Sequence, residues 1–314
     1  MNLTASSVDI IQQKFEDNKY LEQMFKHIEL CGRTCYKSEH KITDDSYIKF
    51  INMIENKGHL SVFEHGTVYL YLCADDNNQH FKPSSCNTSD NTNNNTSNCP
   101  INIPNFDWDS YCKHMGQKYT DNPYSETNII FKDNKVHYYI TTNYRVIKEN
   151  RWTDDLLYLV EPTEYHKKRL TIKFVCDRGV SHELVRHRPM SFSQESTRFC
   201  NYLKENFGMS VTFVQPDWIK EEDQKEFEED LKTVEKLYFK YLGKGYAPQQ
   251  ARYFLINGTK TEICITGFES QWIYFFYLRY LGKAGSPHPD MLKVSTEAYK
   301  KLKNEKIFSF IDEQ

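Results

Sequence analysis

The 314-residue sequence lacks two motifs that would indicate common kinds of site. Its nine cysteines contain no Cys-x-x-Cys pair, and an odd number of cysteines does not complete a disulfide framework. We therefore expect free thiols in a reducing compartment and no metal site. A Gly-x-Gly-x-x-Gly motif is also absent, which argues against a Rossmann-type dinucleotide site.

Long apolar runs and a strong charge bias are missing as well. Met1 to Phe15 shows no basic start followed by an apolar run, and Arg279 interrupts the most apolar late stretch. We therefore expect no signal peptide, no membrane contact and an intracellular, cytoplasmic protein. A formal net charge of −3 gives no general attraction to nucleic acid, so any basic site must be local. The apolar content of 39%, with no visible linker, predicts a sizeable core and a single domain over residues 1–314.

A local basic site is indicated by residues 186–199, which read Arg-His-Arg-Pro-Met-Ser-Phe-Ser-Gln-Glu-Ser-Thr-Arg-Phe. Between residues 184 and 199 there is no lysine and only one acid, Glu195. A solvated surface is the alternative interpretation, but in this lysine-rich chain it would be expected to carry Lys and Glu. Guanidinium groups stay protonated and bind phosphate through two parallel hydrogen bonds. The stretch therefore predicts a site for an anionic, oxygen-rich ligand.

Apolar periodicity predicts where the regular elements lie. Helices are expected at residues 17–35, at 43–57 with Thr43 as N-cap and Gly58 as stop, at 154–160, at 221–242, from Pro248 onward, and up to Arg279. Strands are expected at residues 67–72, at 129–131 paired with 136–141 as a hairpin, at 170–175 and at 211–214. Residues 75–165 contain a polar tract that interrupts this pattern. Within it, residues 84–99 are dominated by polar residues that cannot offset their ordering entropy, so we expect disorder there.

Residues 186–199 resemble the signature of the flavin-dependent thymidylate synthases, Arg-His-Arg, two free positions, Ser, one free, Asn-Glu, one free, Ser, one free, Arg-Tyr. Six positions match in register, namely Arg186, His187, Arg188, Ser191, Ser196 and Arg198. Three differ, with Ser193 in place of Asn, Gln194 in place of Glu and Phe199 in place of Tyr. The resemblance extends over residues 17–72 and 170–300, and it implies that residues 75–165 are an insertion.

The resemblance implies a fold and a reaction. The fold would be α/β, close to α+β, with a twisted sheet flanked by helices, which is the thymidylate synthase-complementing fold. The protein would be a homotetramer that holds FAD between subunits. The reaction would be the reductive methylation of dUMP to dTMP, with methylene-tetrahydrofolate as carbon donor and NADPH to reduce the FAD.

The resemblance also assigns roles to individual residues. Arg279 would be the catalytic residue, contacting the uracil ring. The residues expected to bind dUMP are Glu183, Arg186, Gln194, Ser196, Arg198, Arg252 and Arg279. Those expected to bind FAD are His65, Thr67, Arg186, His187, Arg188, Gln194, Tyr274 and His288. Without the resemblance, His65 would be taken for a structural hydrogen-bonding residue, and Arg279 could equally extend to solvent.

The cysteines bear on the mechanism. None of the ten prolines is followed by cysteine, so the Pro-Cys nucleophile of the other thymidylate synthases is absent. Cys200 follows the motif directly, whereas Cys176 and Cys264 lie in apolar runs that predict burial. We therefore expect the uracil ring to be activated electrostatically. Two alternatives remain, a non-enzymatic nucleotide-binding or regulatory protein and a module that binds single-stranded RNA.

Overall fold

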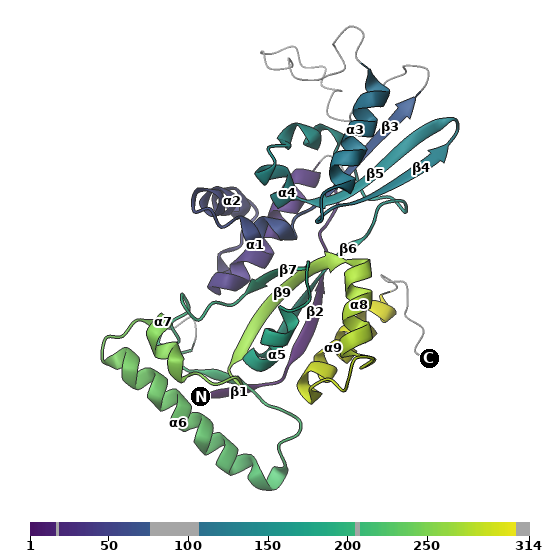
Figure 1. Cartoon of the computed structure of the whole chain (residues 1–314). Helices are drawn as coiled ribbons and strands as arrows, with labels where there is room; N and C mark the ends of the chain where they lie inside the picture. The colour runs from purple at the N-terminus through teal and green to yellow at the C-terminus, as the bar shows by residue number, and fades with distance from the viewer. Residues whose placement is uncertain (17–18, 76–106, 205–207, 306–314) are drawn as a thin grey trace. The chain divides into compact units, whose positions relative to one another are not determined.

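The structure is a computed structural model that describes residues 1–16, 19–75, 107–204 and 208–305 (Figure 1). It is a mixed α/β protein, as predicted, and it divides into two compact units. Unit 1 consists of Met1–Gln12, Phe25–His65 and Arg169–Gln314, and unit 2 of Gln13–Met24 and Gly66–Lys168. The expected insertion, residues 75–165, falls in unit 2. Its expected disordered part, residues 84–99, lies outside the described residues.

The main sheet of unit 1 has four antiparallel strands in the order β2-β6-β9-β7. Their bounds are Ser7–Ile11 for β2, Arg169–Asp177 for β6, Ser191–Gln194 for β7 and Lys260–Phe268 for β9. β6 and β9 pair over nine residues, from Arg169 with Phe268 to Asp177 with Lys260. The predicted strand at 170–175 is confirmed as β6. β7, which the sequence did not predict, is formed by the middle of the Arg-His-Arg stretch.

Successive residues of a strand point to opposite faces, so β6 and β9 divide their side chains between two environments. On one face Ile172 lies opposite Ile265 and Phe174 opposite Ile263, and all four are buried. Three helices cover this apolar face, α5 (Arg178–Leu184), α8 (Glu269–Arg279) and α9 (Pro289–Asn304). The predicted helix up to Arg279 is thereby confirmed. These helices and this face form the core of unit 1.

The other face of the sheet is polar although it is buried. Here a hydrogen-bonded chain, which we call the buried polar layer, joins His27, Thr171, Thr266, His65 and Ser193. Its successive side-chain contacts measure 3.0, 2.7, 2.7 and 2.9 Å. His27 lies on α1 (Tyr20–Tyr36) and His65 at the end of a 3₁₀ helix, Leu60–His65. Burial lowers the pKa of His27 to about 4 and that of His65 well below its ordinary value, so both imidazoles are neutral near pH 7.

The remaining elements of unit 1 surround this sheet. α2 spans Ser46–Asn56, α6 Gln224–Gly243 and α7 Pro248–Ala251, while β1 (Asn2–Thr4) pairs in parallel with β8 (Thr212–Val214). The helices expected at 221–242 and from Pro248 are confirmed, as is the strand at 211–214. The prediction that Thr43 is the N-cap of α2 is wrong, because Asp45 occupies that position. α2 begins three residues after Thr43, and its first residue, Ser46, instead accepts the Thr43 N–H through its hydroxyl at 2.9 Å.

Unit 2 contains a three-stranded antiparallel sheet in the order β3-β5-β4, with α3 (Trp108–Thr120) and α4 (Tyr144–Glu149). β3 spans Thr67–Asp75, β4 Glu126–Lys132 and β5 Lys135–Asn143. The predicted hairpin is confirmed. Asp133 and Asn134 adopt positive φ angles of 52° and 61° at its two-residue turn, which suits such a hairpin.

One predicted element of unit 2 is wrong. The helix expected at 154–160 is a 3₁₀ helix, Thr153–Tyr158. Leu159 is already extended and forms a bridge with Leu70 of β3, so a strand contact ends the turn before an α-helix can form. No helix among the described residues is long and apolar enough to cross a membrane.

Gly32 provides a test of the packing of α1. A Cβ atom at this position would lie 2.6 Å from Cγ1 of Val62 and 2.7 Å from Cζ of Phe50. We therefore expect Gly32→Ala to lower the free energy of unfolding by about 1–3 kcal/mol, although alanine favours helix. Gly243→Ala is the matched control, because nothing lies within 4 Å of that Cβ position. Equal urea midpoints for the two variants would contradict the close packing at Gly32.

His27 predicts a pH dependence of stability. Its pKa is about 4 in the folded protein, against about 6.5 in an unfolded chain. Between these values the unfolded chain binds the proton more readily, so stability falls as the pH falls from about 6.5 toward 4. This shift alone corresponds to a loss of about 2 kcal/mol between pH 8 and pH 5. Urea unfolding at both pH values should show a smaller loss for His27→Gln than for the unaltered protein.

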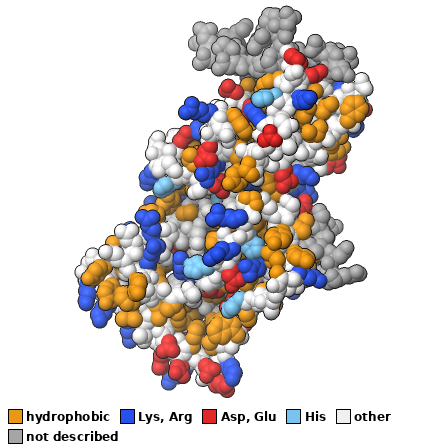
Figure 2. All heavy atoms as spheres, viewed as in Figure 1, with side chains coloured by type: hydrophobic (Ala, Val, Ile, Leu, Met, Phe, Trp, Pro, Cys, Tyr) orange, Lys and Arg blue, Asp and Glu red, His pale blue; other side chains and the backbone are white. Residues whose placement is uncertain are grey.

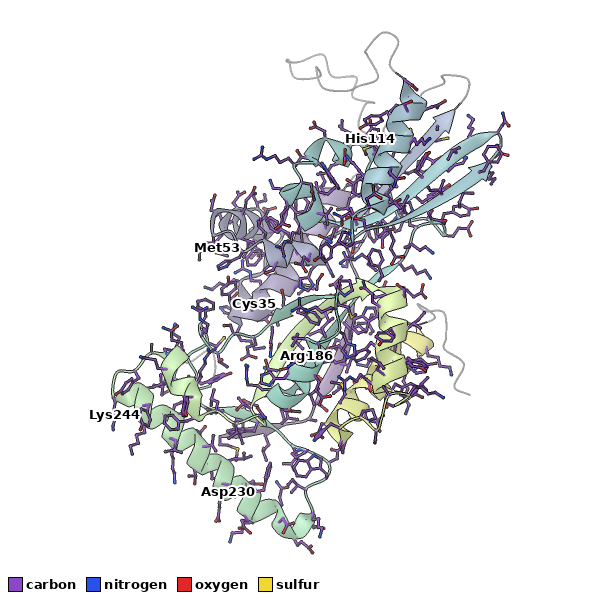
Figure 3. The ribbon with its side chains drawn as sticks, in the orientation of Figure 1. Cys35, Met53, His114, Arg186, Asp230 and Lys244 are labelled. Atoms are coloured by element: carbon purple, nitrogen blue, oxygen red, sulfur yellow. The ribbon has the colours of Figure 1, made fainter. Side chains whose placement is uncertain are left out.

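The control for this experiment is His114→Gln on α3. His114 is exposed, so its replacement should leave the pH dependence unchanged (Figure 3). An unaltered pH dependence in His27→Gln would show that the buried imidazole is not its source.

Candidate functional site

The Arg-His-Arg triplet occupies the turn between α5, which ends at Leu184, and β7, which begins at Ser191. A cavity of about 490 Å³ opens beside it. It is lined by Arg186, His187, Arg188, Met190, Ser270, Gln271, Tyr274, Leu278 and Arg279. The turn and one side of α8, from Ser270 to Arg279, are therefore brought to one place. Figure 2 shows basic and histidine side chains around the position that Figure 3 labels Arg186.

Arg279, which lines this cavity, is held by two side chains. Its Nη1 donates to Oε2 of Glu183 at 2.7 Å, and its Nε donates to Nε2 of His187 at 3.1 Å. Arg279 thus has a carboxylate partner rather than extending freely to solvent. Even with Glu183 counted, Arg186, Arg188 and Arg279 leave the cavity with a net positive charge.

His187 is neutral in this arrangement. Burial and the neighbouring Arg279 lower the pKa of His187 to about 4. Its Nε2 accepts the Arg279 hydrogen bond, so the ring proton is on Nδ1. The ring also packs edge-on against Phe275, with centroids 4.9 Å apart. His187 therefore acts here as a hydrogen-bond acceptor and not as a cation.

The only acid of the motif is not a partner of its arginines. Glu195 is buried, and its Oε2 accepts from Nζ of Lys260 at 3.0 Å. Its Oε1 accepts from the Tyr202 hydroxyl at 3.2 Å. The charges of Arg186 and Arg188 are therefore not offset by Glu195 and remain available to an anion.

The cysteines lie elsewhere. Cys176 and Cys264 are buried, as predicted, and Cys200 is buried as well, with 2% exposure. Burial, with the nearby Glu195 charge, raises the pKa of the Cys200 thiol to about 12. None of the seven cysteines that the structure describes lines this cavity. The arrangement offers electrostatic stabilisation and no thiolate nucleophile.

Five predicted nucleotide-binding residues lie outside the lining of this cavity, namely Glu183, Gln194, Ser196, Arg198 and Arg252. Gln194 donates through Nε2 to Ser181 at 2.8 Å and to Thr261 at 3.2 Å. Arg252 donates to the Thr197 hydroxyl at 3.3 Å, and the Ser196 hydroxyl accepts the Arg198 N–H at 3.3 Å. We call Ser196, Thr197, Arg198 and Arg252 the second basic group. Because Arg252 contacts Thr197, the structure brings it to the motif from a distant part of the chain.

Besides Gln194, three predicted flavin contacts also lie outside the cavity. His65 is fully buried and both its ring nitrogens are engaged in the buried polar layer, so a flavin contact would require the ring to leave those partners. Thr67 belongs to unit 2, where its N–H donates to Gln13 at 2.8 Å. His288 precedes α9 and lines a different cavity. Their roles toward a flavin stay predictions.

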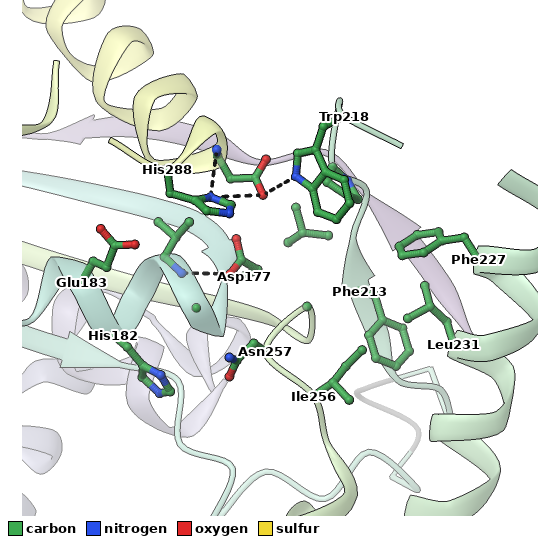
Figure 4. A pocket seen from close by; sticks show the side chains of 16 residues that line it. Asp177, His182, Glu183, Phe213, Trp218, Phe227, Leu231, Ile256, Asn257 and His288 are labelled. Atoms are coloured by element: carbon green, nitrogen blue, oxygen red, sulfur yellow. Dashed lines mark hydrogen bonds and ion pairs between the residues drawn. The ribbon is translucent and has the colours of Figure 1, made fainter. Parts of the chain in front are cut away.

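This second cavity has a volume of about 550 Å³ and lies in unit 1 (Figure 4). Its polar side includes Asp177, Glu183, His288 and Asp290, and its walls include Phe213, Trp218, Phe227, Leu231 and Ile256. Asp290 accepts from the Trp218 ring N–H at 3.1 Å, and Asp177 accepts the Val180 N–H at 2.9 Å as the N-cap of α5.

Sequence reasoning missed several residues of both cavities. Ser270, Tyr274 and Leu278 recur every four residues, so helical spacing from the predicted Tyr274 could have identified the other two. Asp177 closely follows the predicted strand at 170–175, and an Asp directly after a strand is a common N-cap. Trp218 and Asp290 carry no comparable signal.

Comparison with known proteins gives the following matches. The family described as Thymidylate synthase complementing protein matches residues 133–305. The flavin-dependent thymidylate synthase of Pyrococcus furiosus is 34% identical over 112 residues, which are 35% of this chain and 45% of that protein. The probable flavin-dependent thymidylate synthase of Paramecium bursaria Chlorella virus 1 is 26% identical over 145 residues, 41% of this chain and 65% of that protein. This chain therefore spans less than half the length of the first curated relatives that it matches.

A solved structure is also similar. The UMP/dUMP methylase PolB from Streptomyces cacaoi, bound with 5-Br dUMP, matches with a TM-score of 0.40 and 12% identity over 97% of this chain and 93% of that one. The family match covers more than half of the chain and includes both the Arg-His-Arg triplet and Arg279. The chain belongs to the family of thymidylate synthase complementing proteins.

Proposed function

We propose that this protein is an intracellular enzyme that converts dUMP to dTMP by flavin-dependent reductive methylation. The proposal rests on the cavity that Arg186, Arg188 and Arg279 line together. Three guanidinium groups beside a neutral imidazole suit a phosphate-bearing ligand, because their charge does not depend on pH near neutrality. Membership of the family and the names of the curated relatives support the same reaction.

The chemistry of the donor set fits FAD. Arg186 and Arg188 can pair with the two charges of its pyrophosphate, and Tyr274, which is 60% exposed, offers an aromatic ring beside them. When bound, the flavin would deliver a hydride that NADPH supplies, and methylene-tetrahydrofolate would supply the carbon. The protein's own part is to hold the anionic groups and to place Arg279 at the uracil ring.

Arg279 is proposed to stabilise negative charge on the uracil. A guanidinium fixed by Glu183 and His187 needs no reorganisation when charge develops on a nearby oxygen. The buried Cys200 supports a route without a thiol adduct, because its thiol is protonated at neutral pH. The ring must then be activated by positioned charge alone.

We further propose a homotetramer with FAD between subunits. The second basic group does not line the cavity that holds Arg279, so the predicted dUMP contacts fall into two sets within one chain. A neighbouring copy that supplied one set would complete the site. The seven cysteines that the structure describes are all unpaired, which supports a reducing, intracellular location.

The main alternative is a nucleotide-binding protein without turnover. Ser193, Gln194 and Phe199 differ from the family signature, and Gln194 is occupied by Ser181 and Thr261. A purified protein that is yellow and that oxidises NADPH would favour the enzyme over this alternative and over an RNA-binding module. A colourless protein that binds dUMP but does not take up added FAD would favour the alternative.

Arg279 and Cys200 provide the test of mechanism. We expect Arg279→Ala to retain flavin and NADPH oxidation but to lose dTMP formation by a factor on the order of a hundred or more, the scale for one stabilising donor. Cys200→Ser should keep substantial dTMP formation, because the thiol is buried and outside the cavity. An inactive serine variant together with a nearly normal Arg279→Ala variant would mean that the chemistry depends on a thiol.

Arg188 and Arg252 test the division between the two sets of contacts. Arg188 lines the cavity proposed for FAD, so Arg188→Ala should lower the flavin content after gel filtration. Arg252 belongs to the second basic group, so Arg252→Ala should mainly weaken dUMP binding in a calorimetric titration. Equal flavin loss in both variants would contradict the division.

A further inference from the structure

Glu183 and Arg279 form an ion pair that stands between the two cavities. Arg279 lines the cavity of about 490 Å³, and Glu183 lines the one of about 550 Å³. Their contact of 2.7 Å joins residues that are 96 positions apart in sequence. The Arg279 side chain is 24% exposed and the Glu183 side chain 36%, so the pair is shielded from water only in part.

The contact with Glu183 is one of three that fix Arg279. The Nε atom of Arg279 donates to His187 at 3.1 Å, and its backbone carbonyl accepts from the Ser295 hydroxyl at 2.8 Å. His187 is in turn packed against Phe275 of the core. The residue is therefore fixed at its backbone, at Nε and at one terminal nitrogen.

These contacts leave part of the guanidinium available. An arginine side chain has five N–H donors, and Glu183 and His187 each accept one of them. A free arginine loses considerable rotamer freedom when it binds a ligand, and contacts made beforehand remove much of that loss. The anchored side chain presents its remaining donors in one orientation.

We propose that Glu183 is a positioning residue that orients Arg279 toward the bound nucleotide, and that it acts through Arg279 rather than by touching the uracil ring. This inference rests on the proposed function for its kinetic consequence. A charge-assisted bond from a guanidinium to a carboxylate is stronger than one to a neutral amide.

Kinetics distinguish positioning from contact. Glu183→Ala should lower kcat for dTMP formation roughly ten- to a hundred-fold, because a misplaced catalytic group costs about that much. The KM for dUMP should change by less than about three-fold. Glu183→Gln should restore most of the loss in kcat, because its amide oxygen can still accept from Arg279. A raised KM with unchanged kcat in Glu183→Ala would overturn the proposal in favour of direct contact with dUMP.

A measurement that does not depend on activity tests the same geometry. In a ¹⁵N-edited spectrum, the Nε–H signal of Arg279, assigned by its loss in Arg279→Lys, should be protected from exchange by its hydrogen bond to His187. In Glu183→Ala the signal should broaden or disappear, and in Glu183→Gln it should persist. An unchanged signal in Glu183→Ala would overturn the positioning role, even if the protein made no dTMP. Absence of dTMP formation in the unaltered protein would instead count against the proposed function.

A matched control separates this pair from ion pairs in general. Arg145 and Glu149 of α4 form a similar contact of 2.8 Å on the surface of unit 2. Glu149→Ala should leave kcat, KM and the Arg279 signal unchanged, because surface pairs contribute little. An equal loss of kcat in Glu149→Ala would show that the effect of Glu183→Ala is not specific, and it would overturn the assignment. Thermal unfolding of all three variants identifies any that are not folded.

Discussion

The continuous antiparallel pairing of β6 with β9 determines the arrangement of unit 1. Nine residue pairs run from Arg169 with Phe268 to Asp177 with Lys260, a ladder about 30 Å long. α5 leaves the end of β6, and α8 leaves the end of β9. Because the strands are antiparallel, the two helices start at opposite ends of the ladder. Both helices pack on the apolar face of the ladder and run toward each other. α5 is about 10 Å long and α8 about 16 Å, so together they nearly span the ladder. Glu183 near the end of α5 is thereby brought close to Arg279 at the end of α8.

The same pairing explains why charged groups can lie on the other face. Glu262 of β9 is contacted by Lys173 of β6 at 2.7 Å, and also by Lys260 and Lys37. Burial raises the pKa of Glu262, but these three cations outweigh it and hold the pKa well below its ordinary value. Lys260 in addition bonds Glu195. Glu195 and Glu262 are thus satisfied by lysines, which leaves Arg186 and Arg188 free to pair with a ligand.

The fold was predictable from the sequence where apolar residues recur at strand or helix spacing. β3, β6 and α6 follow from apolar runs or helical spacing, because each buries apolar side chains, and the hairpin agrees with turn-forming Asp133 and Asn134 between its strands. β7 was not predictable, since Ser191 and Ser193 are polar but face a buried polar layer instead of water. The 3₁₀ helix at Thr153–Tyr158 was missed because a long-range bridge ends it.

The candidate site was predictable only in part. Charge composition alone indicated an anion site at Arg186 and Arg188, whereas Arg279 was joined to it through the family resemblance. The Glu183–Arg279 pair required the tertiary structure, because nothing local in either segment specifies a partner 96 residues away. The burial of Cys200 was also hidden, since the residues beside it are polar and aromatic in mixed order.

Because His187 is neutral, the positive charge of the cavity comes from its arginines and does not vary with pH near neutrality. Arginine side chains do not lose their protons near neutral pH, and the low pKa of His187 keeps the imidazole uncharged in the same range. Protonation of His187 would place a second cation 3.1 Å from Arg279 and remove the acceptor that holds its Nε. Burial against Phe275 and repulsion from Arg279 both oppose that protonation, so the contacts that orient the guanidinium also keep its acceptor unprotonated. The orientation of Arg279 and the neutral state of His187 are therefore set by one group of contacts.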